Sequence, residues 1–140
     1  MIVQDDQVLL ALWNEDAERR RWTLPGGGVE LHESPADGAV REVKEETGYD
    51  VELTRLLGIE TDVFAEAERQ RGAGAYDGRS LKAVRVFYAA RIVGGELAPE
   101  VGGTTDEARW FALDDIEHLH RVSMVDTGLR LLRTPEDARE

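Results

Sequence analysis

The stretch from Gly27 to Tyr49, GGVELHESPADGAVREVKEETGY, constrains this chain more than any other part of it. If Pro35 to Thr47 forms a helix, Glu42 and Glu46 lie one turn apart and Glu45 lies beside them. Like charges on one helical face repel, at a cost of about a few tenths of a kcal/mol per pair. A solvated face tolerates that repulsion, and a hard cation removes it, because magnesium and calcium prefer carboxylate oxygens. The stretch therefore predicts an acidic helix that is either solvated or part of a metal site.

The two ends of this helix carry clear signals. Ser34 suits the N-cap, Pro35 suits the first helical position, and Gly48 suits the C′ stop. Asp37 adds a negative charge to the first turn, which the helix dipole favours. The apolar positions recur at helical spacing, at Ala39, Val40, Val43 and Thr47. We expect this stripe to face the core, and the carboxylates to project away from it or along its edge.

Length and charge limit the classes of function. With 140 residues, the chain is long enough for one domain with a sizeable core but not for two. Its formal net charge of -12 argues against long nucleic acid as a partner, because binding to the phosphate backbone depends on Lys and Arg. A small anionic substrate remains compatible if metal ions supply positive charge. The charge is equally consistent with solubility alone.

Other composition features concern the compartment. The chain has no cysteine, which excludes disulfides and thiolate chemistry. No apolar run approaches the ~18 residues that a membrane-spanning helix needs. The first residues, MIVQDDQVLL, lack the basic region of a secretory signal. We expect a cytoplasmic protein without membrane contact.

The first part of the chain predicts a hairpin. The residues from Val8 to Trp13 form a continuous apolar run, which is typical of a strand buried on both faces. Ile2 and Val3 precede it, separated by Asp5-Asp6, and indicate the end of an earlier strand. The abrupt start suggests that a native segment before this strand is missing.

The remaining elements are predicted in order along the chain. We expect strands at Trp22–Leu24, Leu81–Val93 and Glu107–Phe111. Asp50–Glu60 is predicted to form a strand, a turn and a second strand that continues to Val63, and Gly94-Gly95 a hairpin turn into Glu96–Ala98. Helices are predicted at Asp114–Leu119 and Val125–Arg133. Residues 65–80 and 99–106 are predicted to be loops, and residues 134–140 a frayed tail. No repeat or linker divides the sequence, which indicates one mixed α/β domain over residues 1–140.

The opening stretch fits a specific pattern, G-x5-E-x7-R-E-U-x-E-E-x-G-U, where U is a bulky aliphatic residue. The matching residues are Gly27, Glu33, Arg41, Glu42, Val43, Glu45, Glu46 and Gly48. The pattern strongly resembles the signature of the Nudix hydrolase family, and Tyr49 is its one departure, standing where an aliphatic residue is usual. The flanking sequences Trp-Thr-Leu-Pro-Gly-Gly and Asp-Glu-Ala-Arg-Trp-Phe resemble common Nudix surroundings more loosely. The resemblance implies an α/β/α sandwich with a mixed β-sheet.

The resemblance also implies roles for the residues of the pattern. Family members use Mg²⁺ or Mn²⁺ to neutralise a pyrophosphate and to activate a water. Glu42, Glu45 and Glu46 would be the principal metal ligands, and Glu42 and Glu45 would also take part in catalysis. The carbonyl of Gly27 would complete a coordination sphere, and Glu33 would serve a further metal or contact the helix carboxylates through water. Arg41 would orient Glu45 by a charge-assisted hydrogen bond, since the two are spaced i, i+4.

The sequence leaves the identity of the general base undecided. In parts of the family it lies within the pattern, and in others it is a Glu from a late loop. Glu107 and Glu100 are the candidates here, and we prefer Glu107. The alternative reading of Glu107 is a surface residue at the start of a strand.

Four residues outside the pattern are candidates for binding substrate. Arg19 and Arg21 belong to a run of three arginines that is either a solvated loop or a phosphate contact. Phe64 occupies the region where ADP-ribose-cleaving members tend to carry a proline, and it suits stacking on a base. Arg85, in a predicted strand, is the fourth candidate.

The function implied by the resemblance is metal-dependent hydrolysis of a pyrophosphate bond in a nucleoside di- or triphosphate derivative. Because the ADP-ribose marker is absent, a nucleoside triphosphate, modified or not, is the first choice of substrate. The alternatives are ADP-ribose or another nucleotide sugar, and a Nudix module that senses a nucleotide without hydrolysing it. A small-molecule nucleotide as the partner, and a monomer or homodimer as the assembly, complete the expectations.

Overall fold

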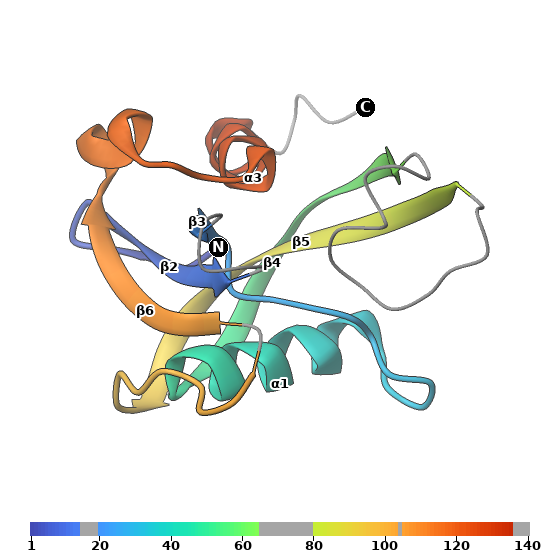
Figure 1. Cartoon of the computed structure of the whole chain (residues 1–140), viewed down its shortest axis with the longest axis horizontal. Coiled ribbons are helices and arrows are strands. Elements are labelled where there is room, and N and C mark those ends of the chain that lie inside the picture. The colour runs from blue at the N-terminus through green and yellow to red at the C-terminus, as the bar shows by residue number, and fades with distance from the viewer. Residues whose placement is uncertain (15–19, 65–79, 104, 136–140) are drawn as a thin grey trace.

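The structure, a computed structural model, describes residues 1–14, 20–64, 80–103 and 105–135. Two antiparallel β-sheets lie between helix α1 (Pro35–Thr47) on one side and helix α3 (Ser123–Arg133) on the other (Figure 1). The bounds of α1 are those predicted from its caps. This layering of helix, sheets and helix confirms the expected α/β sandwich.

Strand β2 (Gln7–Asn14) is the centre of the first sheet. Along one edge it pairs with β1 (Val3–Gln4) and with β3 (Arg20–Thr23). Along the other edge it pairs with β6 (Thr105–Ala112). All three pairings are antiparallel. Through its pairing with β6, strand β2 brings the beginning of the chain beside a segment near its end.

The second sheet is a long ribbon of β4 (Tyr49–Phe64) and β5 (Leu81–Gly95). The turn predicted within Asp50–Glu60 is wrong, because β4 is one continuous strand with three register shifts. Gly58, which lies within this segment, serves close packing. A Cβ on Gly58 would lie 3.0 Å from a methyl carbon of Leu131 in α3, so glycine lets helix and strand approach.

The predicted hairpin turn at Gly94-Gly95 is also wrong. Both glycines pair with the first residues of β4 and extend β5, and Glu96–Ala98 forms no strand. Gly95 has a φ of 78°, and a Cβ on it would lie 2.3 Å from the carbonyl oxygen of Gly48. The glycine is required by this close approach of two backbones, which the local sequence does not reveal.

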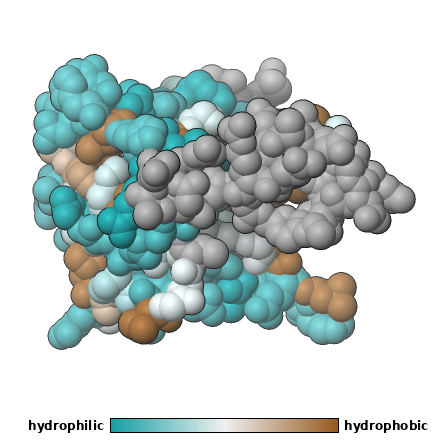
Figure 2. Space-filling model, in the orientation of Figure 1, coloured by the Kyte–Doolittle hydropathy of each residue, from teal (hydrophilic) through white to brown (hydrophobic). Residues whose placement is uncertain are grey.

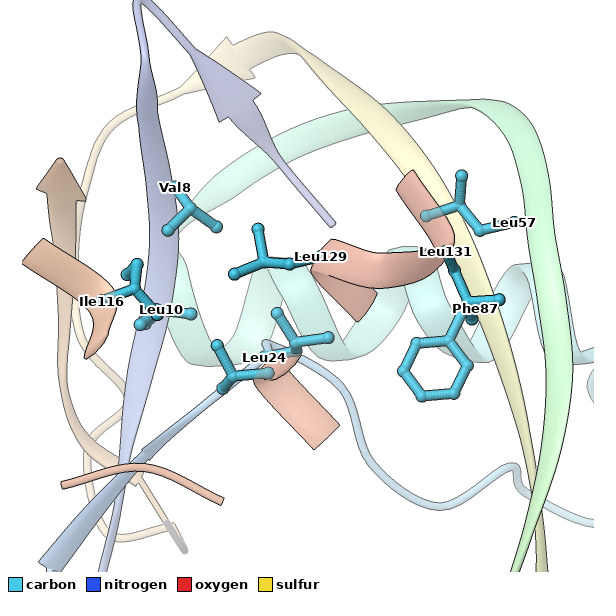
Figure 3. Close-up of a cluster of buried hydrophobic side chains, with 9 residues drawn as sticks. Val8, Leu10, Leu24, Leu57, Phe87, Ile116, Leu129 and Leu131 are labelled. Carbon is cyan, nitrogen blue, oxygen red and sulfur yellow. The ribbon is translucent and has the colours of Figure 1, made fainter. Parts of the chain in front are cut away.

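The core consists of two clusters, one on each face of the sheets. Alternation along β2 sends Val8 and Leu10 into the cluster beneath α3 and Leu9 into the cluster against α1, so the strand is buried on both faces as predicted. The α3 cluster comprises Val8, Leu10, Leu24, Leu57, Phe87, Ile116, Val125, Leu129 and Leu131 (Figure 3). The smaller cluster comprises Ile2, Leu9, Val43 and Val51. The acidic helix is therefore anchored through the smaller cluster.

The other predicted elements differ little from those observed. The N-terminal hairpin turns at Asp5 and Asp6, which both have positive φ, and the short helix near the C-terminus is the 3-10 helix η1 (Leu113–His118). A parallel bridge between Ile2 and Ala90 connects the two sheets, so the pairing is mixed. Residues 65–79 of the predicted loop and 136–140 of the predicted tail lie outside the described residues.

The surface agrees with the strongly polar composition. In the coloured part of the face seen in Figure 2, hydrophilic residues predominate and the hydrophobic residues occur in small separate groups. Within the described part of the chain, no helix has the length and apolar character that crossing a membrane requires.

Candidate active site

Helix α1 is fixed at both ends by local contacts. The Ser34 hydroxyl oxygen accepts a hydrogen bond of 3.1 Å from the backbone N–H of Asp37, as an N-cap does. Gly48 ends the helix with a φ of 79°, and Lys44 Nζ donates to its carbonyl at 3.1 Å. Because both ends are fixed, the helical period alone decides where the acidic side chains lie around the axis.

Arg41 is the hub of the acidic stretch. Its guanidinium donates to Glu33 Oε1 at 2.6 Å, to Glu42 Oε1 at 2.9 Å and to Glu45 Oε2 at 3.0 Å. It also donates to the carbonyl oxygen of Gly28 at 3.0 Å. Hydrogen bonds from Arg41, and then one from the backbone of Glu30, lower the pKa of Glu33 to about 2. One cation thus ties the loop before the helix to two helical carboxylates, where the spacing predicted only the contact with Glu45.

Glu46 lies in a different environment from the other carboxylates. Its side chain points inward and the residue is only 4% exposed, although we expected the acidic residues to lie off the buried face. The backbone N–H of Gly26 donates to Glu46 Oε2 at 2.8 Å. Burial, and then the negative charges of Glu42, Glu100 and Glu45, raise its pKa to about 8, against the effect of the Gly26 bond. A buried carboxylate surrounded by like charges is a site that a cation would stabilise.

The glycine run before the helix lies directly against these carboxylates. A Cβ on Gly27 would come within 2.6 Å of the Glu42 carboxyl group, so the side chain of Glu42 occupies the space that any larger residue would need. Gly26 and Gly28 supply the donor to Glu46 and the acceptor from Arg41 described above. The sequence indicated only that this loop permits a close backbone approach.

The donor set fits a divalent cation in its chemistry. Carboxylates and backbone carbonyls are the ligands that Mg²⁺ and Mn²⁺ prefer. Within the described residues, no three acidic or histidine side chains are arranged to enclose a metal ion. Arg41 accounts for this arrangement, because it draws Glu33, Glu42 and Glu45 to its own guanidinium. A metal site in the acidic stretch would therefore require these carboxylates to turn from Arg41 toward Glu46.

The two candidates for a late acidic residue lie on opposite sides of the sheet. Glu107 pairs with Arg109 of the same strand, and Arg109 lies over the ring of Trp22, which packs against the α3 cluster. Trp110, of opposite parity in β6, packs instead in the cluster with α1. Glu107 therefore faces α3, away from the acidic helix. Glu100 lies in the loop that Ala98 joins to the end of α1, through a backbone hydrogen bond of 2.8 Å to the carbonyl oxygen of Thr47, and its negative charge helps to raise the pKa of Glu46.

A cavity of about 550 Å³ adjoins the glycine loop. It lies between residues 26–28, the Ala39–Val43 face of α1, and the part of β5 from residue 83 to residue 90. Its volume suits a small molecule, and its lining is largely apolar. Arg85 contributes a charged residue to the lining and makes an ion pair of 2.9 Å with Asp62.

The remaining substrate-binding candidates differ in their relation to this cavity. The guanidinium of Arg85 stacks 5.5 Å from the ring centroid of Phe64, so these two predicted residues are neighbours. The guanidinium of Arg21 lies over the ring of Trp13 at 5.1 Å, and Arg21 is not among the described residues that line the cavity. Arg19 lies outside the described residues.

Comparison with known proteins identifies the family. The family model for the NUDIX domain matches residues 1–129. The Putative ADP-ribose pyrophosphatase YjhB of Bacillus subtilis (strain 168) is 43% identical over 131 residues, which cover 94% of this chain and 56% of the relative. The ADP-ribose pyrophosphatase of Methanocaldococcus jannaschii is 30% identical over 120 residues, covering 85% and 62% of the two chains. The chain spans between 26% and 62% of the length of the first four curated relatives that it matches.

Solved structures agree with the sequence relatives. A NUDIX hydrolase from Nitrosomonas europaea superposes with a TM-score of 0.73 at 24% identity, covering 99% of this chain and 90% of that one, and it supports the fold. An ADP-ribose pyrophosphatase from Streptococcus suis 89-1591 superposes with a TM-score of 0.64 at 29% identity, covering 99% and 87%. The resemblance seen in the sequence is confirmed by both kinds of comparison.

Proposed function

This chain belongs to the Nudix family, and we propose that it is a divalent-metal-dependent pyrophosphohydrolase acting on a nucleotide derivative. The observation that carries the proposal is the burial of Glu46 among like charges, beside a glycine loop and an arginine-held acidic helix. We assign Glu42, Glu45 and Glu46 as the principal metal ligands, with the Gly27 carbonyl and Glu33 in supporting positions. When bound, Mg²⁺ or Mn²⁺ would neutralise the pyrophosphate and lower the pKa of a bound water.

The residues of the chain itself hold and orient this chemistry. Arg41 fixes the carboxyl groups of Glu33, Glu42 and Glu45, which keeps them within reach of one another before metal enters. Gly26 holds Glu46 through its backbone amide. These contacts keep the acidic groups close together, and metal binding would then turn the carboxylates held by Arg41 toward Glu46.

For the late acidic residue we propose Glu100 in place of Glu107. Glu107 is paired with Arg109 on the α3 face of the sheet, whereas the charge of Glu100 acts on Glu46. Glu100 is therefore the better candidate to accept a proton from the attacking water.

For the substrate, the relatives favour a nucleotide sugar over the nucleoside triphosphate that was our first choice. Two curated relatives and one solved structure carry the name ADP-ribose pyrophosphatase. The largely apolar cavity beside residues 26–28 suits a nucleoside, and Arg85 and Phe64 stand near it for contact with phosphate or base. We propose ADP-ribose or a close analogue as the substrate, with a nucleoside triphosphate as the second class.

The test is a substrate panel with Mg²⁺ or Mn²⁺, in which each product is identified. Hydrolysis of ADP-ribose adds water across the P–O–P bond and yields AMP and ribose 5-phosphate. Release of inorganic pyrophosphate from a nucleoside triphosphate would instead favour the second class. Metal and nucleotide binding without turnover on any member of the panel would overturn the enzyme proposal and favour a nucleotide-sensing module.

The domain content, location, partners and oligomeric state of the protein stay predictions. A single Nudix domain, a cytoplasmic location, a small-molecule partner in place of long nucleic acid, and a monomeric or homodimeric state are each consistent with the net charge of -12 and with the match to residues 1–129.

A further inference from the structure

The side chain of Glu100 is held by the first residue of strand β6. The hydroxyl of Thr105 donates a hydrogen bond of 3.1 Å to Glu100 Oε2. Thr105 is the first residue of β6, is only 2% exposed, and pairs with Trp13 of the central strand. The donor therefore stands on the rigid sheet, while its acceptor belongs to the loop before it.

A second contact restricts the same carboxyl group. A Cβ on Gly103 would lie 1.8 Å from the carboxyl carbon of Glu100 and within about 2 Å of both its oxygens. The carboxylate thus occupies the space that a side chain at position 103 would fill. Glu100 has three rotatable side-chain bonds, and contacts from two sides select one of its orientations.

The orientation of the Glu100 carboxylate matters because this residue lies beside the acidic helix α1. The backbone N–H of Ala98, two residues before Glu100, donates at 2.8 Å to the carbonyl oxygen of Thr47, the last residue of α1, so the loop that carries Glu100 lies against the acidic helix. Thr105 itself makes its hydrogen bond to Glu100 and is not among the described residues that line the cavity. The side-chain hydrogen bond from Thr105 to Glu100 is thus the contact through which its hydroxyl would influence the site.

We propose that Thr105 is a positioning residue which, together with Gly103, fixes the carboxylate of Glu100 beside the acidic helix. The proposal rests on the proposed function only for its activity measurement. A merely structural role for Thr105 would be independent of the carboxylate, and this difference is what the experiment measures.

The experiment combines three variants in two backgrounds. Thr105→Val removes the hydroxyl at nearly constant shape, Thr105→Ser keeps it, and Gly103→Ala displaces the carboxylate, which is the flexible end of Glu100. Each is made in the natural chain and in the Glu100→Gln chain. Thr54→Val is the control, since Thr54 is an exposed residue at a register shift of β4. Thermal unfolding confirms that each variant is folded.

We expect Thr105→Val and Gly103→Ala to lower kcat by about tenfold or more with a smaller change in KM, since hydrogen bonds to charged groups are strong. Thr105→Ser should restore kcat to within about threefold of the natural chain. In the Glu100→Gln background, neither variant should cause a further loss, because the group they position has been altered. An equal loss in both backgrounds, or natural kcat in both single variants, would overturn the proposal.

A second measurement separates this proposal from the proposed function. Mn²⁺ binding without any nucleotide, followed by paramagnetic resonance, should weaken in Glu100→Gln, which removes a negative charge beside the acidic helix, and to a smaller extent in Thr105→Val, which releases that charge from its position. If the natural chain hydrolyses nothing, the proposed function fails, and the Mn²⁺ affinities still judge the role of Thr105. A Glu100→Gln chain that matches the natural chain in every measurement, or one whose weaker Mn²⁺ binding Thr105→Val does not share, would overturn the positioning role.

Discussion

The backbone amide of Gly26 donates a 2.8 Å hydrogen bond to Oε2 of Glu46, joining the glycine loop to the last turn of α1. This bond holds a carboxylate that is 4% exposed, on the side of the helix that approaches the core. The residue just before the family pattern is thereby joined to a buried acidic group near the end of the pattern. The first two predictions follow from this contact.

Glu46→Gln should lower hydrolysis by about a hundredfold or more, because it removes the charge of a proposed metal ligand. The amide oxygen of Gln still accepts from Gly26, so the fold should persist and the metal-free protein should be at least as stable. Steady-state kinetics and thermal unfolding measure the two effects. Glu117→Gln is the control, since that side chain is 75% exposed. Hydrolysis near the natural rate would refute the assignment of Glu46.

The contribution of Glu46 to the stability of the metal-free protein should fall as pH rises. Burial and neighbouring negative charges raise the pKa of Glu46 from 4.5 to about 8, so the folded protein keeps a proton that the unfolded chain has lost. The contribution of Glu46 is therefore most favourable below pH 4.5 and is lost progressively as pH rises to about 8. Thermal unfolding of the natural chain and of Glu46→Gln, with a chelator present and over this pH range, measures the contribution of Glu46 as the difference in stability between the two chains. A Glu46→Gln chain with the same pH dependence would show that another group is responsible.

Arg41→Lys should impair the site although it keeps the positive charge. The guanidinium bridges three carboxylates and a carbonyl, and a single ammonium group cannot reproduce that planar set of donors. We expect kcat/KM to fall by about tenfold or more. Arg91→Lys is the matched control, because Arg91 pairs with Glu52 on an exposed part of the ribbon. Equal kinetics for the two variants would contradict the role of Arg41.

Gly38→Ala should separate stability from activity. Alanine in a helix is more favourable than glycine by about 0.5–1 kcal/mol, which should raise or preserve the melting temperature. The new Cβ would lie 2.9 Å from Glu33 Oε1 and should push this carboxylate from Arg41, lowering turnover. Ala36→Gly, the reverse change in the same helix, should lower stability and leave turnover intact. A Gly38→Ala chain with full activity would argue against a role for Glu33.

Glu100→Gln and Glu107→Gln provide a direct comparison of the two late acidic residues. The negative charge of Glu100 helps to raise the pKa of Glu46, whereas Glu107 is paired with Arg109 on the opposite face of the sheet. We expect kcat to fall by about tenfold or more in Glu100→Gln and to remain nearly unchanged in Glu107→Gln. The pH profile of kcat for both variants measures this, and the reverse order of effects would restore Glu107 as the base.

Sequence patterns predicted much of the site because its main element is local. Ser34 and Gly48 cap helix α1 through contacts within its own ends, so its bounds follow from nearby residues. The i, i+4 contact between Arg41 and Glu45 follows from the helical period in the same way. The bonds from Arg41 to Glu33 and Gly28 depend on how the preceding loop folds back, and no local signal predicts their geometry.

The sequence by itself determined the acidic helix, the doubly buried strand β2 and the family, since caps, periodicity and fixed spacing are properties of neighbouring residues. Only the tertiary structure decided that β4 continues through Gly58, because the reason is the close approach of Leu131. It likewise decided that Glu46 is buried and that Glu107 faces α3. Burial and the facing of a side chain depend on packing partners distant in the chain, which a sequence pattern does not specify.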